Sequence, residues 1–196
     1  QDMMIMHIIA QNQWERPIYF AMTVAGENKI GLQNNLRVDG MAFKLVPYDA
    51  FNNQMGIPAN LAADRLKENL IEKYRYRNYD DPEVYHNLQK INLLQNLRTC
   101  FLWAIDFYRR HNDEDTVREL LAAHDRSLPE ETVPYMNFQT PAQVAQIYAE
   151  IGDIEKARDM VNNILRREDI NDDIRVELAT ILLMQLEAPE RAEEIA

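Results

Sequence analysis

The pattern of hydrophobic and polar residues changes near residue 60. Before that point, apolar residues form short runs that glycines and prolines interrupt, which excludes long helices. Residues 2–12 are expected to form a short helix, and two runs rich in aromatic and β-branched residues, 17–24 and 41–46, predict paired strands. Because two strands alone are marginal in water, residues 1–60 are expected to form a small α+β region packed on the helices that follow.

Beyond residue 60, apolar residues recur at steps of three and four, which is the spacing of one helix face. A first helix is expected over residues 61–73. A long helix is expected to begin at Asp81 and Pro82, which suit a helix cap and a first turn. Its apolar stripe consists of Val84, Leu88, Ile91, Leu94, Leu97, Phe101, Ala104 and Tyr108. The sequence therefore predicts a mainly α protein, with residues 61–196 helical.

Within the helical part, one pattern recurs after 40 and again after 35 residues. In its clearest copy two helices meet at Gly152, which can adopt the left-handed conformation, and Asp153, which can cap the next helix. Asn112 takes the place of this glycine in the preceding copy. Together with small and aromatic residues at matching positions, the pattern resembles the tetratricopeptide repeat. The resemblance implies antiparallel hairpins stacked as a short superhelix, over about residues 98–130, 138–170 and a truncated 173–196.

The charge of the chain narrows the classes of partner. The net charge is −11, and residues 61–196 hold 27 acidic against 17 basic residues. Such a surface repels phosphate groups, so neither nucleic-acid binding nor direct lipid binding is expected. No apolar run approaches the roughly 18 residues that span a bilayer. The single cysteine, Cys100, lies on the apolar stripe and is expected to be a buried, unreactive thiol.

Possible catalytic and metal-binding motifs have simpler interpretations. The four histidines, His7, His86, His111 and His124, have no partners at metal-ligand spacing. The acidic run 112–115 resembles the start of a calcium loop or a metal-binding acid pair, but it lacks the glycine and the glutamate that would complete a calcium loop, so helix capping is favoured. The acidic run 168–173 is interpreted in the same way. No catalytic residue, metal or cofactor is therefore expected in this chain.

A segment of alternating basic and aromatic residues, 73–80, is one candidate binding site. In an extended segment Tyr74 and Tyr76 would lie on the same side, where a sugar ring or a peptide could stack on them. The alternative is ordinary packing of these tyrosines against the helices. Trp14 and Arg16 have the same two interpretations, and together with Tyr19 they are predicted to lie at the interface between the N-terminal region and the helices.

The concave groove of a tetratricopeptide array is a second candidate binding site. The first helix of each hairpin would line it, which gives Asp106, Arg109, Gln146 and Glu177, with Arg110 and Glu150 at the rim. A mixed polar groove of this kind suits an extended peptide. Solvated helix faces would have the same composition, and both interpretations stay open.

A longer set of motifs resembles one family over most of the chain. Its core is Trp14-x-Arg16-Pro17-Ile18-Tyr19-Phe20, and further matches are 39–47, 81–85 and 133–135. These residues resemble the C-terminal part of large bacterial multi-spanning membrane proteins that contain a domain of unknown function. Members look like glycosyltransferases of the protein O-mannosyltransferase type, with an extracytoplasmic helical-repeat tail. The resemblance implies that this chain is the periplasmic tail and that the catalytic acids belong to the membrane half.

Three functions are consistent with these observations. The leading hypothesis is a non-catalytic module that binds a protein or peptide, or a glycan acceptor, as the tail of a membrane glycosyltransferase-like protein; the membrane half of its own parent is another candidate partner. The second is a free-standing repeat adaptor for protein assembly. The third is a small enzyme with a site in residues 1–60. A multi-spanning sequence upstream of Gln1 would favour the first over the second.

Overall fold

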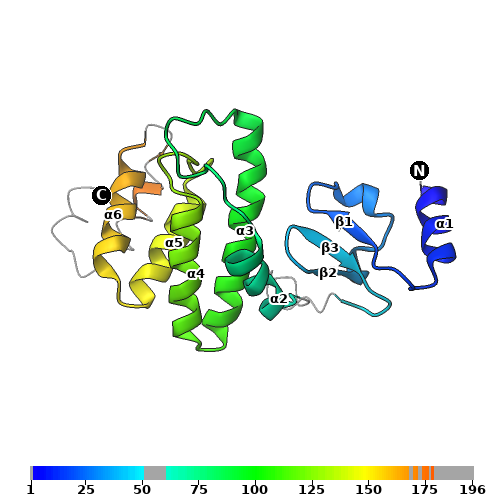
Figure 1. The fold of residues 1–196 in the computed structure, drawn as a ribbon. Coiled ribbons are helices and arrows are strands. Elements are labelled where there is room, and N and C mark those ends of the chain that lie inside the picture. The colour runs from blue at the N-terminus through cyan, green and yellow to red at the C-terminus, as the bar shows by residue number, and fades with distance from the viewer. Residues whose placement is uncertain (1, 51–60, 168–169, 172–173, 177, 179–196) are drawn as a thin grey trace. The chain divides into compact units, whose positions relative to one another are not determined.

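The computed structural model describes residues 2–50, 61–167, 170, 171, 174–176 and 178 (Figure 1). The fold is mainly helical with one small sheet, as the sequence predicts. Two compact units are present, Gln1–Val133 and Pro134–Ala196. The domain boundary near residue 60 remains a prediction from the sequence.

The N-terminal part of the first unit consists of one helix and a three-stranded sheet. Helix α1 spans Asp2–Asn12, as predicted. The strands are β1 (Tyr19–Ala21), β2 (Leu36–Val38) and β3 (Ala42–Leu45), and two 3₁₀ turns, η1 (Gly26–Lys29) and η2 (Gln33–Asn35), lie between β1 and β2. The predicted pairing of the first run with the second is confirmed, because β1 pairs antiparallel with β3. The short strand β2, on the other side of β3, was not predicted.

The two faces of this sheet have different roles. On one face the buried side chains of Phe20, Leu36 and Leu45 form a core, and Ile5 and Ile9 of α1 pack against it. The register places Tyr19 opposite Lys44, and Lys44 opposite Arg37. Directly opposed residues share a face of a sheet, so these three side chains form a row on the face away from the core. We call this face the outer face.

A short helix with a widened second half follows the sheet. Helix α2 (Ala63–Glu68) continues directly into the π-helix η3 (Asn69–Lys73), and the Tyr74 amide donates to the Asn69 carbonyl at 2.8 Å. Leu66 and Leu70 are fully buried and anchor this element in the unit. π-Helical turns are rare and are found frequently at functional sites, because they displace side chains from the regular helical positions.

The long helix of the first unit begins later than predicted. Helix α3 spans Leu88–Arg110, and the Asn87 side chain caps it by accepting from the Lys90 amide. The predicted start at Asp81 is wrong, because the Asp81 carboxylate accepts from the Glu83 amide and stabilises an isolated turn instead. Helix α4 (Glu114–Ser127) follows and packs beside α3.

The second unit contains a hairpin with the same turn as the first. Helices α5 (Gln139–Glu150) and α6 (Ile154–Leu165) meet at Gly152, whose φ is 82°, and the corresponding φ of Asn112 between α3 and α4 is 56°. In both turns the following aspartate amide donates to the carbonyl five residues back, at 3.0 Å for Asp113 and 2.9 Å for Asp153. Both aspartate side chains also cap the next helix. The predicted left-handed turns and caps are therefore confirmed.

The stacking of these hairpins as a superhelix depends on how the two units are placed, and it stays a prediction. The expected third hairpin, 173–196, lies almost entirely outside the described residues. In the part of the chain that the structure describes, no helix has the length and apolarity to cross a bilayer.

Candidate functional site: a polar pocket at the outer face of the sheet

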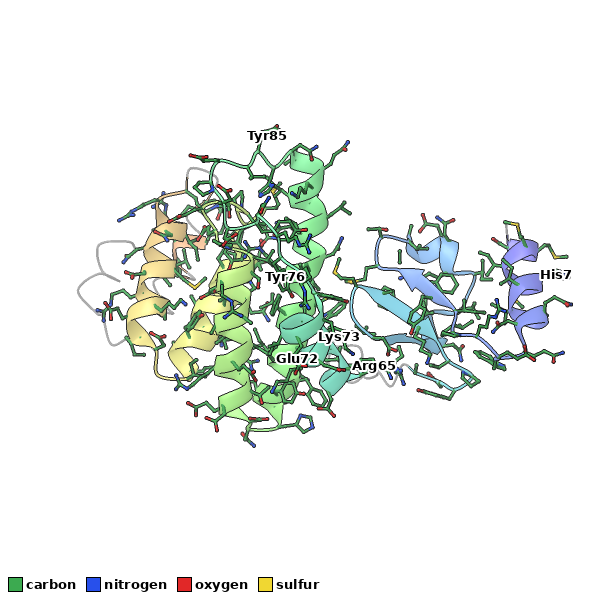
Figure 2. The ribbon with its side chains drawn as sticks, viewed as in Figure 1. His7, Arg65, Glu72, Lys73, Tyr76 and Tyr85 are labelled. Carbon is green, nitrogen blue, oxygen red and sulfur yellow. The ribbon has the colours of Figure 1, made fainter. Side chains whose placement is uncertain are left out.

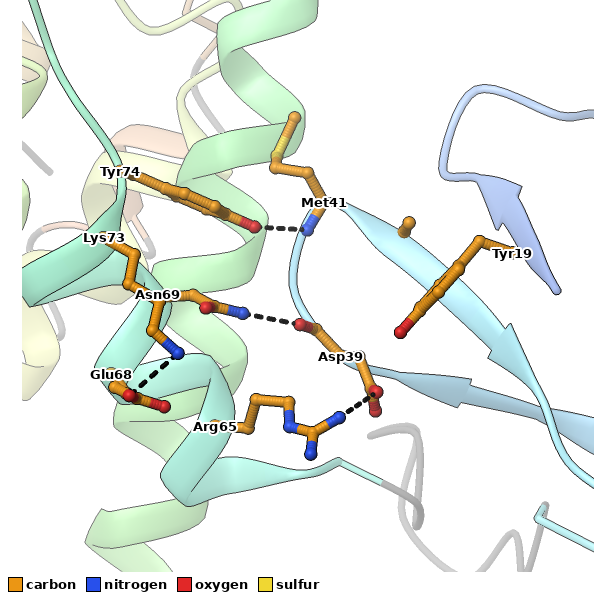
Figure 3. Close-up of a pocket in the computed structure, with 9 residues that line it drawn as sticks. Tyr19, Asp39, Met41, Arg65, Glu68, Asn69, Lys73 and Tyr74 are labelled. Atoms are coloured by element: carbon orange, nitrogen blue, oxygen red, sulfur yellow. Dashed lines mark hydrogen bonds and ion pairs between the residues drawn. The ribbon is translucent and has the colours of Figure 1, made fainter. Parts of the chain in front are cut away.

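The loop between β2 and β3 is fixed to η3 and to Tyr74, which follows it, by hydrogen bonds between side chains and the backbone. The Asn69 amide group donates to the Asp39 carbonyl at 2.8 Å, and the Met41 amide donates to the Tyr74 hydroxyl at 3.0 Å (Figure 3). These contacts join residues about thirty positions apart in the sequence. They hold the end of the sheet against the helix, and a pocket lies beside them.

The carboxylate of Asp39 is the charged centre of this junction. It is nearly buried and accepts from Arg37 at 2.6 and 2.9 Å and from Arg65 at 3.0 Å. Burial raises the pKa of Asp39, but the hydrogen bonds and positive charges of the two arginines outweigh burial, and the net pKa lies below the usual aspartate value. Asp39 therefore stays ionised and links the sheet to α2.

Gly40 allows the close approach of these elements. Its φ of 135° is disfavoured for residues with a side chain, and a Cβ at this position would lie 2.4 Å from the Tyr74 hydroxyl and 3.2 Å from the Asn69 amide nitrogen. A glycine is required here both by backbone conformation and by space. From the sequence, Gly40 indicates only an interruption of the apolar runs.

The pocket has a volume of about 450 Å³ and is lined from both sides of the junction. The sheet and its β2–β3 loop supply Tyr19, Asp39, Met41 and Ala42, and the helical side supplies Arg65, Glu68, Asn69, Lys73 and Tyr74. Lys73 and Glu68 form an ion pair at 2.8 Å. The Tyr19 side chain, half exposed, points into the hollow in Figure 3. We call this hollow the junction pocket.

The junction pocket is polar but has no net charge among its lining residues. The two acids, Asp39 and Glu68, are balanced by Arg65 and Lys73. Donors and acceptors are both present, and the Tyr19 ring supplies a flat apolar wall. Such a lining suits a neutral ligand rich in hydrogen-bonding groups, such as a peptide backbone or a sugar.

The two tyrosines of the basic and aromatic segment meet at a neighbouring pocket. Tyr74 and Tyr76 both line a hollow of about 360 Å³, with Met41, Arg75, Tyr79 and leucines of α3. The Tyr76 hydroxyl donates to the Leu70 carbonyl at 2.6 Å, and burial raises its pKa above the usual tyrosine value. Figure 2 shows Tyr76 beside α3, whereas Tyr85 extends from the loop before that helix. Tyr76 thus packs within the unit and also lines this pocket. Its role in partner binding stays a prediction.

Trp14 and Arg16 line a third hollow, whose walls come only from residues 14–17, 37 and 44–48. Trp14 is 51% exposed. This pocket lies within the N-terminal region, whereas Tyr19 reaches the junction pocket next to the helices. The interdomain role proposed for Trp14 and Arg16 remains a prediction.

The residues expected in a concave groove are distributed over both units. Asp106 is buried and accepts from Arg109 at 2.8 Å and from Arg110 at 3.0 Å. On α5, the Gln146 amide donates to the Glu150 carboxylate at 3.2 Å. Glu177 lies outside the described residues. Both described sets thus satisfy polar groups on their own helix, and their role in binding stays a prediction.

The acidic run 112–115 and Cys100, for which no catalytic or metal-binding role is expected, have structural roles. Asp113, in the acidic run 112–115, caps α4 through the Thr116 amide. Cys100 is buried, and burial raises its pKa to about 12, so its thiol is unreactive at neutral pH as predicted. Among the described residues, no group of three or more His, Cys, Asp or Glu side chains is placed to bind a metal ion.

Most of the junction pocket was not foreseen from the sequence. Tyr74 and Tyr19 were singled out, but Asp39, Arg65 and Asn69 were not, because they come from separate elements and carry no motif. The closest signal was the pair Asp39-Gly40 just before the strand-like run 41–46, which is typical of a tight turn. The π-helix has no comparable sequence signature.

Comparison with known proteins gives one match. Residues 1–64 match the family model described as TMEM260-associated domain 2. No curated protein and no solved structure matches the chain. The matched segment includes the sheet and the β2–β3 loop and stops at the start of α2, so it supplies one wall of the junction pocket. This part of the chain is similar to that domain.

Proposed function

We propose that this chain is a non-catalytic module that binds a protein or peptide at the junction pocket. The observation that carries the proposal is the chemistry of this pocket: it is neutral, fixed on both sides by hydrogen bonds, and rich in donors and acceptors next to an exposed tyrosine. An extended peptide presents alternating N–H and C=O groups and side chains, and it needs a wall of this kind. A glycan-bearing acceptor would use the same groups.

The state of the two carboxylates supports binding rather than catalysis. Asp39 is held by two arginines, and Glu68 is paired with Lys73. A general base works best with a pKa near the working pH, whereas the pKa of Asp39 is shifted downwards. Both acids therefore serve better to position neighbouring groups than to move protons.

The parent of the module is proposed to be a membrane protein of the glycosyltransferase type. The match of residues 1–64 to TMEM260-associated domain 2 supports a membrane-bound parent. The resemblance to protein O-mannosyltransferase-type proteins supports sugar transfer by the parent, with this chain on the periplasmic side of a bacterial membrane. In this proposal the module docks the acceptor protein while the membrane half carries out the transfer.

Two matched tyrosine substitutions in the full-length parent test this proposal. Tyr19→Ala removes the wall of the junction pocket, and Tyr85→Ala removes a tyrosine that is 86% exposed and does not line this pocket. Loss of an aromatic contact of about 1.4 kcal/mol corresponds to a tenfold weaker complex. We expect Tyr19→Ala to raise the KM for sugar transfer to an intact acceptor protein about tenfold with kcat retained, and Tyr85→Ala to have no effect.

A second test compares sugar transfer by the full-length parent with transfer by a parent from which this chain has been deleted. Unchanged transfer to every protein acceptor after deletion would reject a docking role. A parent with no membrane-spanning sequence would reject the glycosyltransferase setting and favour the repeat-adaptor alternative.

A further inference from the structure

The third hollow, which Trp14 and Arg16 line, combines positive charge with aromatic walls. Its volume is about 370 Å³, and its lining includes three basic residues, Arg16, Arg37 and Lys44, against one acid, Glu15. Most of the remaining lining is apolar or aromatic, and two aromatic side chains, Trp14 and Tyr48, are each about half exposed. We call this hollow the cationic pocket. It stands out in a chain whose net charge is −11.

Two of its cations have no acidic partner. Arg37 is paired with Asp39, but among the described residues no hydrogen bond or ion pair engages the Arg16 guanidinium or the Lys44 ammonium group. Elsewhere in the same unit basic side chains find carboxylates, as Lys67 does with Glu119. Arg16 and Lys44 therefore leave a local positive field that a ligand can neutralise.

One wall of the cationic pocket is fixed by its backbone. Gln13 and Trp14 follow α1 with φ values of 46° and 65°, a left-handed conformation that is costly for residues with side chains. Two hydrogen bonds close this turn: the Glu15 amide donates to the Asn12 carbonyl at 2.8 Å, and the Asn12 side chain donates to the Arg16 carbonyl at 2.8 Å. The turn thus keeps Trp14 at the surface next to Arg16.

The opposite wall is fixed as well. The Asn35 side chain donates to the Tyr48 carbonyl at 3.0 Å, and Arg37 donates to the Tyr48 hydroxyl at 3.4 Å. Lys44 lies on β3, opposite Tyr19 and Arg37 in the neighbouring strands. A pocket with two preorganised walls loses little conformational entropy when a ligand binds.

The cationic pocket and the junction pocket lie along the same face of the sheet. Ala42 lines the junction pocket and Lys44 lines the cationic pocket, and these residues are two positions apart on β3, so that their side chains share the outer face. Tyr19, which lines the junction pocket, is paired with Lys44, which lines the cationic pocket. Two residues of a strand span about 7 Å, so a peptide of a few residues is long enough to reach both pockets.

We propose that the cationic pocket binds an acidic side chain of the partner peptide, next to a proline or an aromatic residue that packs on Trp14 and Tyr48. This inference rests on the proposed function and names the chemistry of its partner. Arg16 and Lys44 neutralise the carboxylate, and the prolines and aromatic rings of the walls complement an apolar neighbour. The partner is thus an acidic, extended segment that crosses the outer face of the sheet.

A short peptide fits the charge distribution better than a polyanionic surface. The acidic helical part of the chain repels nucleic acid and anionic membranes as a whole. At physiological salt, however, a charge is felt over only about 8 Å, so a single carboxylate responds chiefly to the two cations beside it. Membrane binding is treated as an alternative outcome of the test.

The fluorescence of Trp14 provides a direct readout. The chain has two tryptophans, so Trp103→Phe leaves Trp14 as the sole reporter. A blocked Gly-Pro-Glu-Pro-Glu-Pro-Gly peptide is titrated into this variant, with the corresponding Gln-Pro peptide as the neutral control. We expect a saturable change in Trp14 emission with the Glu-Pro peptide that weakens as salt is added, and a much smaller change with the Gln-Pro peptide.

Variants that each remove one positive charge show whether the peptide binds at the cationic pocket. Arg16→Gln and Lys44→Gln are each expected to raise the dissociation constant of the Glu-Pro peptide about tenfold, the size of one lost charged hydrogen bond. Arg77→Gln removes the same charge from an exposed arginine that does not line the pocket, and it is expected to leave the dissociation constant unchanged. Equal weakening in all three variants would overturn the inference, because binding would then follow net charge alone.

Three further outcomes test this inference, and the last two separate it from the proposed function. Saturable binding of phosphatidylserine-containing vesicles without binding of the Glu-Pro peptide would overturn the acidic-peptide assignment. If the peptide fails to bind but Tyr19→Ala still impairs acceptor docking in the parent, the inference falls and the proposed function stands. If the peptide binds through Arg16 and Lys44 while Tyr19→Ala has no effect on transfer, the cationic pocket stands and docking at the junction pocket falls.

Discussion

The helical hairpins and the sheet region are built by different rules. Each hairpin turn depends on neighbours in the sequence: a left-handed Asn112 or Gly152, followed by an aspartate that caps the next helix. The sheet region depends on distant residues, since Asp39 and Met41 contact side chains 26 to 33 positions away. Contacts between neighbours in the sequence produce regular helices whose polar side chains pair with one another. Contacts between residues far apart in the sequence bring charged, amide and aromatic side chains together around a pocket.

This difference locates the candidate binding site in the irregular part of the molecule. On α3 the charges of Asp106 are taken by Arg109 and Arg110 of the same helix. At the junction pocket, groups from the sheet and from the π-helix converge on one hollow. The following substitutions test whether the two regions differ in this way.

The largest effect is expected from a buried arginine that ties the hairpin of the first unit to the segment after it. Arg98 of α3 donates to the carbonyls of Leu128 at 2.9 Å and of Val133. Arg98→Met would leave these acceptors unsatisfied and should lower the free energy of unfolding by about 3 kcal/mol. Urea denaturation monitored by circular dichroism measures this loss in the free energy of unfolding. The control is Arg118→Met, an exposed arginine paired with Glu114, where a loss below about 0.5 kcal/mol is expected.

A smaller loss is expected at the junction itself. In Gly40→Ala, the new Cβ would meet the Tyr74 hydroxyl at 2.4 Å in a backbone conformation that alanine disfavours. We expect the free energy of unfolding to fall by about 2 kcal/mol, together with loss of binding at the junction pocket. An unchanged melting temperature would show that the loop is not held against Tyr74 and Asn69.

The matched substitution in a hairpin turn should cost less. Gly152 also has a positive φ, but a Cβ there would meet nothing within 4 Å. Gly152→Ala should therefore cost only the conformational term, about 1 kcal/mol, with peptide binding unaffected. Thermal unfolding of both glycine variants separates backbone strain from the steric contact that is specific to the junction.

The smallest effect concerns pH. The pKa of Asp39 is lowered in the folded chain, so its contribution to stability is present above its unfolded-state value of 3.8 and is lost as pH falls through the lower folded value. The melting temperature of the wild type should exceed that of Asp39→Asn at pH 7, and the gap should narrow below about pH 4. A constant gap between pH 7 and pH 3 would contradict the charged link between Asp39 and its arginines.

The sequence was informative where structure is determined locally. The turns at Asn112 and Gly152, the caps and α1 follow from residue types at fixed spacing. The pairing of β1 with β3 was predicted from the composition of two separate runs. The start of α3 was misplaced because Asp81 and Asn87 are both competent caps, and only the folded chain shows that Asp81 closes a separate turn. The short strand β2 was missed because its three residues are stabilised by pairing with β3.

The junction pocket could be predicted only in part for the same physical reason. Tyr74 is conspicuous in the basic and aromatic segment 73–80, and Tyr19 in the motif 14–20; both line the pocket. Arg65 and Asn69 are ordinary residues of a helical pattern. They line the pocket because of the π-helix and because Gly40 allows the β2–β3 loop to approach Asn69 and Tyr74 closely. Neither the π-helix nor this close approach is encoded in a short motif.

Amide hydrogen exchange with and without a bound acceptor protein tests the central claim most directly. If the junction pocket and the outer face of the sheet form the binding site, protection should appear in residues 37–48 and 65–74. The helix faces at 106–110 and 146–150 should exchange as in the free chain. Protection confined to those helix faces, with none at the sheet, would contradict the account and favour a groove between hairpins instead.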